Sequence, residues 1–475
     1  MIKFNIIHTN DLHGHLENWP IIREYFKLKK ASYTQKKEPF LLLDIGDALD
    51  TVHPMVEASQ GVIMVDLFNE AGYDVVTIGN NEGLNFTNSQ LNYLYSHANF
   101  EVALANLLDS RTYDYPTWAS PITYREIEGQ RIAMIGLTAP YATYVLNQYN
   151  LIDPFDALEQ QMRIIQRSNQ AVDLIIVLSH LGLKDDRLLA QKFPEIDLII
   201  GGHTHHVLHD GEIAYQSTLA AAGKYGYYVG DIELELLAET DHVARTGQKR
   251  RWKIDCQLLT IEQLQALTNI PISDSFEIQG RQLLQKQAIA NLPYRVTAEQ
   301  TYGKHSFIQL ALDAICDATQ TKIAMLSTGL FLRDLPAGVV TENELHEALP
   351  HSMHLIVMTF TGQHLVELLE EMQNQEDDLR ERLINGMGFR GKIFGEFVLK
   401  GLSYIEATGQ WFAGDSLIDK NQIYRVAAVD HYWFIPFFPT IANYGAPQLI
   451  FPSFLRHVVA DYMRKRFPLI DTGED

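Results

Sequence analysis

The chain of 475 residues contains very little cysteine. Its two cysteines, Cys256 and Cys316, are too few for a disulfide framework and lack the paired spacing of a metal site. We therefore expect both to be small, buried, apolar side chains. So little cysteine also fits a reducing compartment.

Long apolar runs are missing as well. No uninterrupted apolar stretch approaches the roughly 18 residues that a membrane span requires, so we expect no membrane partner. The N-terminal sequence MIKFNIIHTNDLHGH has a short strand-like run, without the apolar region and small-residue cleavage site of a signal peptide. These absences predict a cytoplasmic protein.

Basic residues are scarce relative to acidic ones. The chain has 38 Lys and Arg against 59 Asp and Glu, which gives a formal net charge of −21. Such a surface repels a polyanion, so we expect no polymeric nucleic acid as a partner. Any phosphate-bearing ligand must therefore be held by local positive charge.

The length is enough for two or three domains, each with a core of its own. In the first half of the chain, short runs of Ile, Leu and Val alternate with amphipathic segments, which is typical of a layered α/β domain. Helical spacing covers 155–170 and 184–192, and Asp153 before Pro154 predicts the start of the first of these helices. We assign residues 1–257 to this domain.

A linking helix and a second α/β domain are expected to follow. Residues 274–292 have apolar positions at three- and four-residue intervals and end just before Pro293, which predicts the helix. The second domain then covers 293–475. Its expected elements are helices at 306–319 and 363–384 and strands at 323–327, 355–360 and 423–429.

Five polar clusters each follow directly on an apolar strand of the first domain. Ligands of open α/β sheets bind at the carboxyl ends of strands. Taken singly, each cluster has an ordinary explanation, such as a helix cap, a turn or a hydrogen-bonded core histidine. The clusters are Asp11-Leu12-His13, Gly46-Asp47, Gly79-Asn80, Ser179-His180 and Gly202-His203-Thr204-His205.

Taken together, the clusters supply the imidazoles, carboxylates and amide of a two-metal site that suits Mn, Zn, Fe or Co. Two divalent ions about 3.5–4 Å apart can clamp a phosphoryl group and lower the pKa of a bridging water, so that hydroxide attacks in line. Such a pair needs one shared carboxylate. Asp47 is the best candidate, since Gly46 before it permits a tight turn.

These motifs resemble the calcineurin-like metallophosphoesterases and, within them, the two-domain 5′-nucleotidase / 2′,3′-cyclic-nucleotide phosphodiesterase family. The resemblance implies a four-layered α/β/β/α catalytic domain joined by a helix to an α/β substrate-binding domain. It also implies one ion on Asp11, His13 and His205, another on Asn80, His180 and His203, and Asp47 as the bridge. The matching motifs are TNDLHGH (9–15), DIGD (44–47), GNNE (79–82), SHLG (179–182) and GGHTH (201–205).

The second domain resembles the family less closely. Residues 327–362 are similar to the family's substrate-binding segment and retain its arginine as Arg333, but Thr328 replaces an asparagine and larger residues replace two glycines. His351 and His431 stand where phenylalanines that stack on a base are usual. An imidazole can also stack or donate a hydrogen bond. Arg333, His351 and His431 are therefore the candidate substrate-binding residues.

The motif GNNE departs from the family pattern Gly-Asn-His-Glu. Asn81 replaces the histidine, and Leu84 replaces the aspartate that pairs with it. Because an amide has no titratable proton near neutral pH, Asn81 can hydrogen-bond a phosphoryl oxygen but cannot act as a general acid. Asp47, Asn80 and Asn81 are the candidate catalytic residues.

We therefore expect a 5′-nucleotidase-like hydrolase that releases phosphate from a nucleotide or a similar small phosphate ester through metal-bound hydroxide. The same metal pair could instead serve a cyclic-nucleotide phosphodiesterase or a nucleotide-sugar or dinucleotide pyrophosphohydrolase. A third alternative, from another class, is a ligand-binding protein with weak catalysis.

Overall fold

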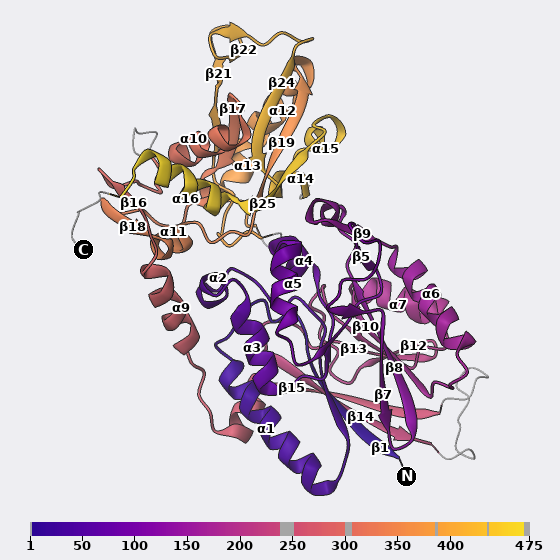
Figure 1. Cartoon of the computed structure of the whole chain (residues 1–475). Helices are drawn as coiled ribbons and strands as arrows, with labels where there is room; N and C mark the ends of the chain where they lie inside the picture. The colour runs from indigo at the N-terminus through magenta and orange to yellow at the C-terminus, as the bar shows by residue number, and fades with distance from the viewer. Residues whose placement is uncertain (1, 238–250, 300–305, 385–387, 435–436, 470–475) are drawn as a thin grey trace. The chain divides into compact units, whose positions relative to one another are not determined.

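The computed structural model of the chain describes residues 2–237, 251–299, 306–384, 388–434 and 437–469 (Figure 1). The chain divides into two compact units, Met1–Gly280 and Arg281–Asp475. Both cysteines are buried, as expected. Among the described residues, none of the helices has the length and apolar character that crossing a membrane would require.

The described part of the first unit is built around two β-sheets (Figure 1). The first sheet has the strand order β15 (Trp252–Thr260), β14 (Tyr228–Leu236), β1 (Lys3–Thr9), β2 (Phe40–Asp44), β3 (Val75–Val76), β4 (Glu101–Ala103) and β6 (Ala119–Ser120). The second has the order β12 (Glu212–Ala214), β13 (Ser217–Ala220), β11 (Leu198–Gly201), β10 (Leu174–His180), β8 (Gln130–Thr138) and β7 (Ile122–Ile127). A small separate pair is formed by β5 (Leu107–Asp109) and β9 (Tyr149–Leu151).

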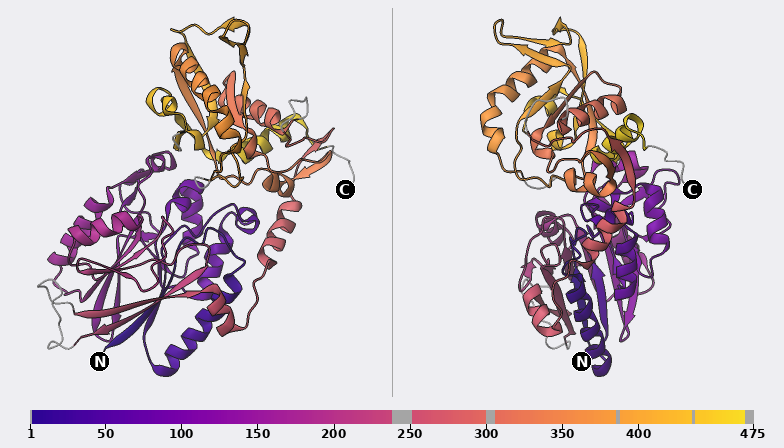
Figure 2. Two further views of the ribbon diagram at one scale, coloured as in Figure 1. Left: turned by 180° about the vertical axis from the view of Figure 1, so that it is seen from behind. Right: turned by 90° about the vertical axis from the view of Figure 1, so that its left-hand side faces the viewer.

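Helices cover the outer faces of both sheets. Those on the side of the first sheet include α1 (Trp19–Lys36), α3 (Val62–Ala71), α5 (Asn88–Ser96) and α8 (Ile261–Thr268), whereas α6 (Pro154–Arg167) and α7 (Leu183–Lys192) lie on the second. Figures 1 and 2 show this order of layers from the front and from behind. The shorter helices are α2 (Pro54–Ala58), α4 (Asn80–Asn85) and the 3₁₀ helix η1 (Ala142–Asn147).

The space between the two sheets is filled by alternate residues of their strands. Phe4 and Ile6 of β1 share this core with Ile176 and Leu178 of β10, and all four are fully buried. Burying one such side chain stabilises the fold by about 1.5–3 kcal/mol. With the two helical layers outside, the unit has the expected four-layered α/β/β/α architecture.

Parallel pairing brings the carboxyl ends of the strands in each sheet to one edge. Thr9 of β1 pairs with Asp44 of β2, which in turn pairs with Val76 of β3. In the second sheet, Ser179 of β10 pairs with Gly201 of β11. The loops that follow these strands are therefore neighbours within each sheet.

The helix boundaries follow the sequence signals in one place and depart from them in another. Asp153 accepts hydrogen bonds from the backbone N–H groups of Phe155 (2.9 Å) and Asp156 (3.2 Å), so α6 begins where predicted. The linking helix α9 (Ser275–Gln285) is shorter than the expected 274–292. Its expected last turn is strand β16 (Ala288–Leu292), because this segment pairs in antiparallel fashion with β18 (Gly338–Thr341).

The second unit contains a sheet with the order β20 (Phe397–Lys400), β17 (Ile323–Ser327), β24 (Ile423–Val429), β19 (His354–Thr361) and β25 (Gln448–Phe454). A separate sheet is formed by β21 (Leu402–Ile405), β22 (Gln410–Ala413) and β23 (Ser416–Leu417). The helices are α10 (Phe307–Thr319), η3 (Thr328–Leu330), α11 (Glu342–Ala348), α12 (Gly362–Asn374), α13 (Glu376–Glu381), α14 (His431–Phe434), α15 (Pro439–Tyr444) and α16 (Leu455–Arg466). The three expected strands are present, whereas the expected helix at 363–384 is divided into α12 and α13.

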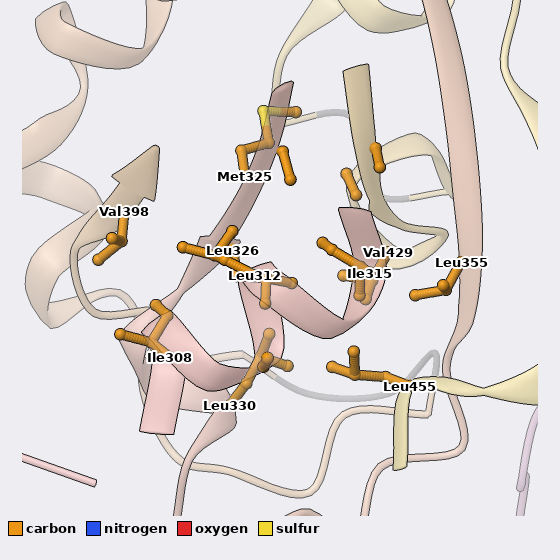
Figure 3. Close-up of a cluster of buried hydrophobic side chains, with 14 of the residues drawn as sticks. Ile308, Leu312, Ile315, Met325, Leu326, Leu330, Leu355, Val398, Val429 and Leu455 are labelled. Carbon is orange, nitrogen blue, oxygen red and sulfur yellow. The ribbon is translucent and has the colours of Figure 1, made fainter. Parts of the chain in front are cut away.

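Figure 3 shows the core of the second unit around α10. Ile308, Leu312 and Ile315 are spaced by four and three residues, so they share one helical face. In the same core lie Leu326 of β17 and Val429 of β24, both fully buried. This packing accounts for the helical spacing seen in the sequence.

Candidate metal centre

The loops at the strand ends bring the predicted ligands together. Asp11 and His13 follow β1, Asp47 follows β2, Asn80 begins α4 just after β3, His180 ends β10, and His203 and His205 follow β11. Six of these residues form two groups, Asp11 with His13 and His205, and Asp47 with His180 and His203, whose potential ligand atoms lie within 4.8 Å of one another in each group. The first group is the ligand set that the resemblance implies for one ion.

Asp47 faces both groups. One of its oxygens, Oδ2, lies 3.2 Å from Nε2 of His180 and 3.7 Å from Nε2 of His13. In the first group, Oδ1 of Asp11 lies 3.5 Å from Nε2 of His205. Asp47 is thus placed where a shared carboxylate would have to be.

Several potential ligand atoms of the site face one another, which favours a cation between them. Nδ1 of His180 donates to the backbone oxygen of Ile45 (2.7 Å), so Nε2 is the ring nitrogen that faces Asp47 and could bind an ion. This Nε2 atom and Oδ1 of Asn80 are both buried without a hydrogen-bond partner among the described residues. A buried acceptor without a partner costs about 1–3 kcal/mol, so these atoms fit a divalent ion well.

The pKa values of the histidines describe the charge state of the site. Burial alone would lower the pKa of His180, but Asp47 and Asp11 raise it to about 10. Burial, together with neighbouring imidazoles, lowers the pKa of His203 to about 4 and that of His205 to about 4, so both are neutral at pH 7. His203 and His205 thus have the neutral form in which imidazoles bind metals, whereas an ion beside Asp47 would have to displace a proton from His180.

Five of the predicted ligands have a left-handed backbone conformation, which costs non-glycine residues about 1–3 kcal/mol each and clusters at functional sites. Hydrogen bonds between the loops stabilise this backbone conformation, since Asp11 N donates to Gly46 O (2.9 Å) and His13 N donates to Asp47 O (2.7 Å). Gly46 itself has φ +90°, and a Cβ there would lie 2.2 Å from the backbone nitrogen of Gly79. The φ angles are 52° at Asp11, 48° at His13, 52° at Asp47, 70° at His203 and 56° at His205.

Glu82 joins two of these loops. Its buried carboxylate accepts four backbone N–H groups: Oε2 from Asp47 (3.1 Å) and Gly79 (2.9 Å), and Oε1 from Ala48 (2.7 Å) and Leu49 (3.0 Å). Both oxygens are therefore used as acceptors, and the side chain holds the loop of Asp47 against that of Asn80.

Replacing Glu82 with glutamine is expected to lower the free energy of unfolding by about 1–3 kcal/mol, because an NH₂ group would then face two N–H donors. Chemical denaturation of the apoprotein measures this loss. Glu101→Gln, whose side chain is 53% exposed, is the matched control. If the two variants were equally stable, the four hydrogen bonds would not hold the loops.

Asn81 is turned toward His13. Its Nδ2 lies 2.8 Å from Nδ1 of His13 and 3.2 Å from Oδ2 of Asp50, and its backbone N–H donates to Oδ1 of Asp47 (2.7 Å). Its Oδ1 accepts from Nδ2 of Asn80 (3.1 Å). These bonds orient the ligands His13 and Asp47, whereas the sequence suggested a contact with the phosphoryl group.

The three candidate substrate-binding residues lie in the second unit. The side chain of Arg333 is 65% exposed and pairs with Glu347 (2.8 Å). His351 is fully buried: its Nε2 donates to Leu330 O (2.6 Å), and its Nδ1 accepts from Arg390 N (2.9 Å). His431 is buried as well, with an exposed fraction of 2%.

Phe389 packs against both imidazoles. Its ring centroid lies 5.1 Å from that of His351 at an interplanar angle of 6°, and 5.5 Å from that of His431 at 34°. The position of a ring stacked on His351 is thus taken by the chain itself.

Two residues of the site had no role in the sequence analysis. Asn10 binds the carboxylate of Asp11 through Nδ2 (2.8 Å), and Asp50 has Oδ2 at 3.4 Å from Nδ1 of His13. Asn10 lies inside the motif TNDLHGH, and Asp50 lies three residues after the end of DIGD. Polar residues beside a ligand motif are the signal that could have found them.

Two family models and several known proteins are similar to this chain. The family model of the calcineurin-like phosphoesterases matches residues 4–207, and that of the 5′-nucleotidase C-terminal domain matches 286–433. The uncharacterized metallophosphoesterase YunD of Bacillus subtilis is 33% identical over 96% of this chain and 98% of its own length. The 5′-nucleotidase of Rattus norvegicus is 28% identical over 48% of this chain and 42% of its own length.

Solved structures share the fold over almost the whole chain. The NAD nucleotidase of Haemophilus influenzae has a TM-score of 0.61 at 17% identity, covering 98% of this chain and 96% of that one. The 5′-nucleotidase precursor of Thermus thermophilus has a TM-score of 0.55 at 20% identity, covering 98% and 97%.

Proposed function

Because the chain belongs to the calcineurin-like phosphoesterases that carry a 5′-nucleotidase C-terminal domain, we propose that it releases phosphate from a small phosphate monoester with the help of two divalent ions. Asp11, His13 and His205 would hold one ion, and His180, His203 and Asn80 the other, with Asp47 beside both groups. The placement of Asp47 against both groups is the observation that supports this most strongly. The donor set suits Mn, Zn, Fe or Co.

The residues of the site have distinct tasks in this hydrolysis, in which the ester P–O bond breaks as water adds to phosphorus and gives a proton to the leaving oxygen. When bound, the ions polarise the phosphoryl group and activate the water. Asp11 and Asp47 supply the negative charge that holds them, and neutral His203 and His205 supply lone pairs. Asn81 lies against Nδ1 of His13 (2.8 Å) and so keeps the imidazole ring in place.

The packing of Phe389 supports a substrate whose base is not read by stacking on His351 or His431. Assays on metal-loaded protein test the proposed substrate class. If the base is not read by stacking, kcat/KM should be similar for AMP, GMP, CMP and UMP. It should also lie within about tenfold of the value for ribose 5-phosphate, which corresponds to a binding difference of about 1.4 kcal/mol. A strong preference for one base would contradict this. Turnover of cyclic or dinucleotide diesters without turnover of monoesters would replace the proposed reaction by a diesterase.

Replacing Arg333 with alanine is expected to raise KM for a nucleotide several-fold, because a guanidinium that is 65% exposed contributes about 0.5–1.5 kcal/mol through a hydrogen bond to the nucleoside. Turnover of p-nitrophenyl phosphate should change little, since it lacks the group that Arg333 binds. Arg295→Ala is the matched control, because Arg295 is 70% exposed and forms an ion pair with Asp334 in the same unit. Equal losses on both substrates would give Arg333 a structural role.

A further inference from the structure

The loop of residues 222–228 is tied to the first ligand group by three hydrogen bonds. The backbone N–H of Tyr225 donates to Asp11 O (2.8 Å), and that of Ala222 donates to Oδ1 of Asn10 (3.0 Å). In return, Nδ2 of Asn10 donates to Gly223 O (2.8 Å). Because Asn10 also binds the carboxylate of Asp11, this loop keeps a constant position relative to the candidate ligand.

The ring of Tyr225 lies against three imidazoles of the site. Its centroid is 5.7 Å from that of His13, at an interplanar angle of 79°, and 6.3 Å from that of His205, at 47°. It also stacks on His15 at 3.8 Å and 25°. The tyrosine is only partly buried, so it borders the open side of the first ligand group.

Lys224 places a positive charge at this border. Its Nζ lies 4.4 Å from the centroid of Tyr225, within the range of a cation–π contact. The side chain is half-buried, and among the described residues it has no carboxylate partner. The same tyrosine ring lies against His13 and His205, so the ammonium borders the first ligand group.

We propose that Lys224 is a substrate-binding residue whose ammonium binds the phosphoryl group of the substrate beside Asp11, His13 and His205. This inference rests on the proposed function. The two carboxylates offset part of the charge of the two proposed ions, and the chain as a whole carries a net charge of −21, so an ammonium without a carboxylate partner adds attraction for a phosphate dianion. An ammonium is a compact charge with three donors, and the Tyr225 ring holds it in place.

The proposed contact distinguishes Lys224 from Arg333. Lys224 would bind the phosphoryl group, which all phosphate esters share. Its loss should therefore weaken the binding of every ester and of inorganic phosphate to a similar extent. Because the phosphoryl charge is present in both ground and transition states, the loss should appear mainly in KM. Arg333, in contrast, should affect only substrates with a nucleoside.

The test compares Lys224→Gln and Lys224→Arg with the wild type, and Lys27→Gln, an exposed lysine of α1, serves as the control. We expect Lys224→Gln to raise the Kd of inorganic phosphate, measured by calorimetry on metal-loaded protein, by about tenfold or more. KM for p-nitrophenyl phosphate should rise in parallel, with kcat and metal content within about twofold of wild type. Lys224→Arg, which keeps the charge, should recover most of the affinity.

The outcomes separate this inference from the proposed function. Wild-type phosphate affinity in Lys224→Gln would overturn the inference even if the protein hydrolyses esters. A tenfold loss of phosphate affinity in a protein that hydrolyses no ester would support the inference and refute the proposed function. Loss of bound metal in Lys224→Gln would show that the lysine supports the site structurally, and would overturn the inference as well.

Discussion

Replacing Asp47 with alanine is expected to remove both ions and to lower kcat/KM by about 10³-fold or more, since the charge stabilisation at stake is several kcal/mol. The reason is geometric. One oxygen of Asp47 lies 3.2 Å from Nε2 of His180 and 3.7 Å from Nε2 of His13, so its loss takes a ligand from both groups. It also leaves two cations without the anion between them.

His205→Ala also tests the assignment of Asp47 as the shared carboxylate, because His205 belongs to the first group alone. It should lose one ion and less activity than Asp47→Ala. Asp66→Ala, an exposed aspartate of α3, is the control and should retain both ions. Equal metal content in Asp47→Ala and the wild type would contradict the shared-carboxylate assignment.

The rate of hydrolysis is expected to depend steeply on the leaving group. General acid catalysis contributes about 10²–10⁴-fold, and its absence harms poor leaving groups most. Asn81 has no titratable proton, and its amide is bonded to His13 and Asp50. We therefore expect slow hydrolysis of alkyl phosphates, such as a ribose 5′-ester, and comparatively fast hydrolysis of aryl esters and anhydrides.

Other groups near the site are engaged elsewhere. Glu82 accepts four backbone N–H groups, Nδ1 of His15 lies 2.9 Å from Glu17, and Nδ1 of His206 lies 2.8 Å from Oγ1 of Thr204. The measurement is kcat/KM over esters of graded leaving-group pKa, for the wild type and for Asn81→His combined with Leu84→Asp. The double variant should flatten the dependence. A shallow slope in the wild type, unchanged by the substitutions, would mean that another residue already acts as the acid.

The candidate site could be predicted from the sequence because its residues follow the ends of apolar strands. Parallel pairing within each sheet then places the loop of Asp47 beside that of Asp11, and the loop of His203 beside His180. The left-handed conformation at these residues and the role of Glu82 could not be predicted. They depend on hydrogen bonds between loops, such as the one from Asp47 to Glu82, 35 positions along the chain.

In the second unit, too, the features that the sequence did not predict depend on contacts between distant residues. Its strands β17 and β24 lie where apolar runs predicted them. His351 is buried against Phe389, which lies 38 positions further on and outside the segment 327–362 from which His351 was chosen. Likewise, α9 ends at Gln285 because the next residues pair with β18, a partner that periodicity alone does not reveal.

Metal stoichiometry tests the central claim most directly. Elemental analysis of the purified wild-type protein should find about two divalent transition-metal ions per chain, since the two ligand groups share Asp47. Exhaustive chelation should abolish ester hydrolysis, and reloading with Mn²⁺ or Co²⁺ should restore it in proportion to the metal bound. Full activity in protein stripped of metal would contradict the account.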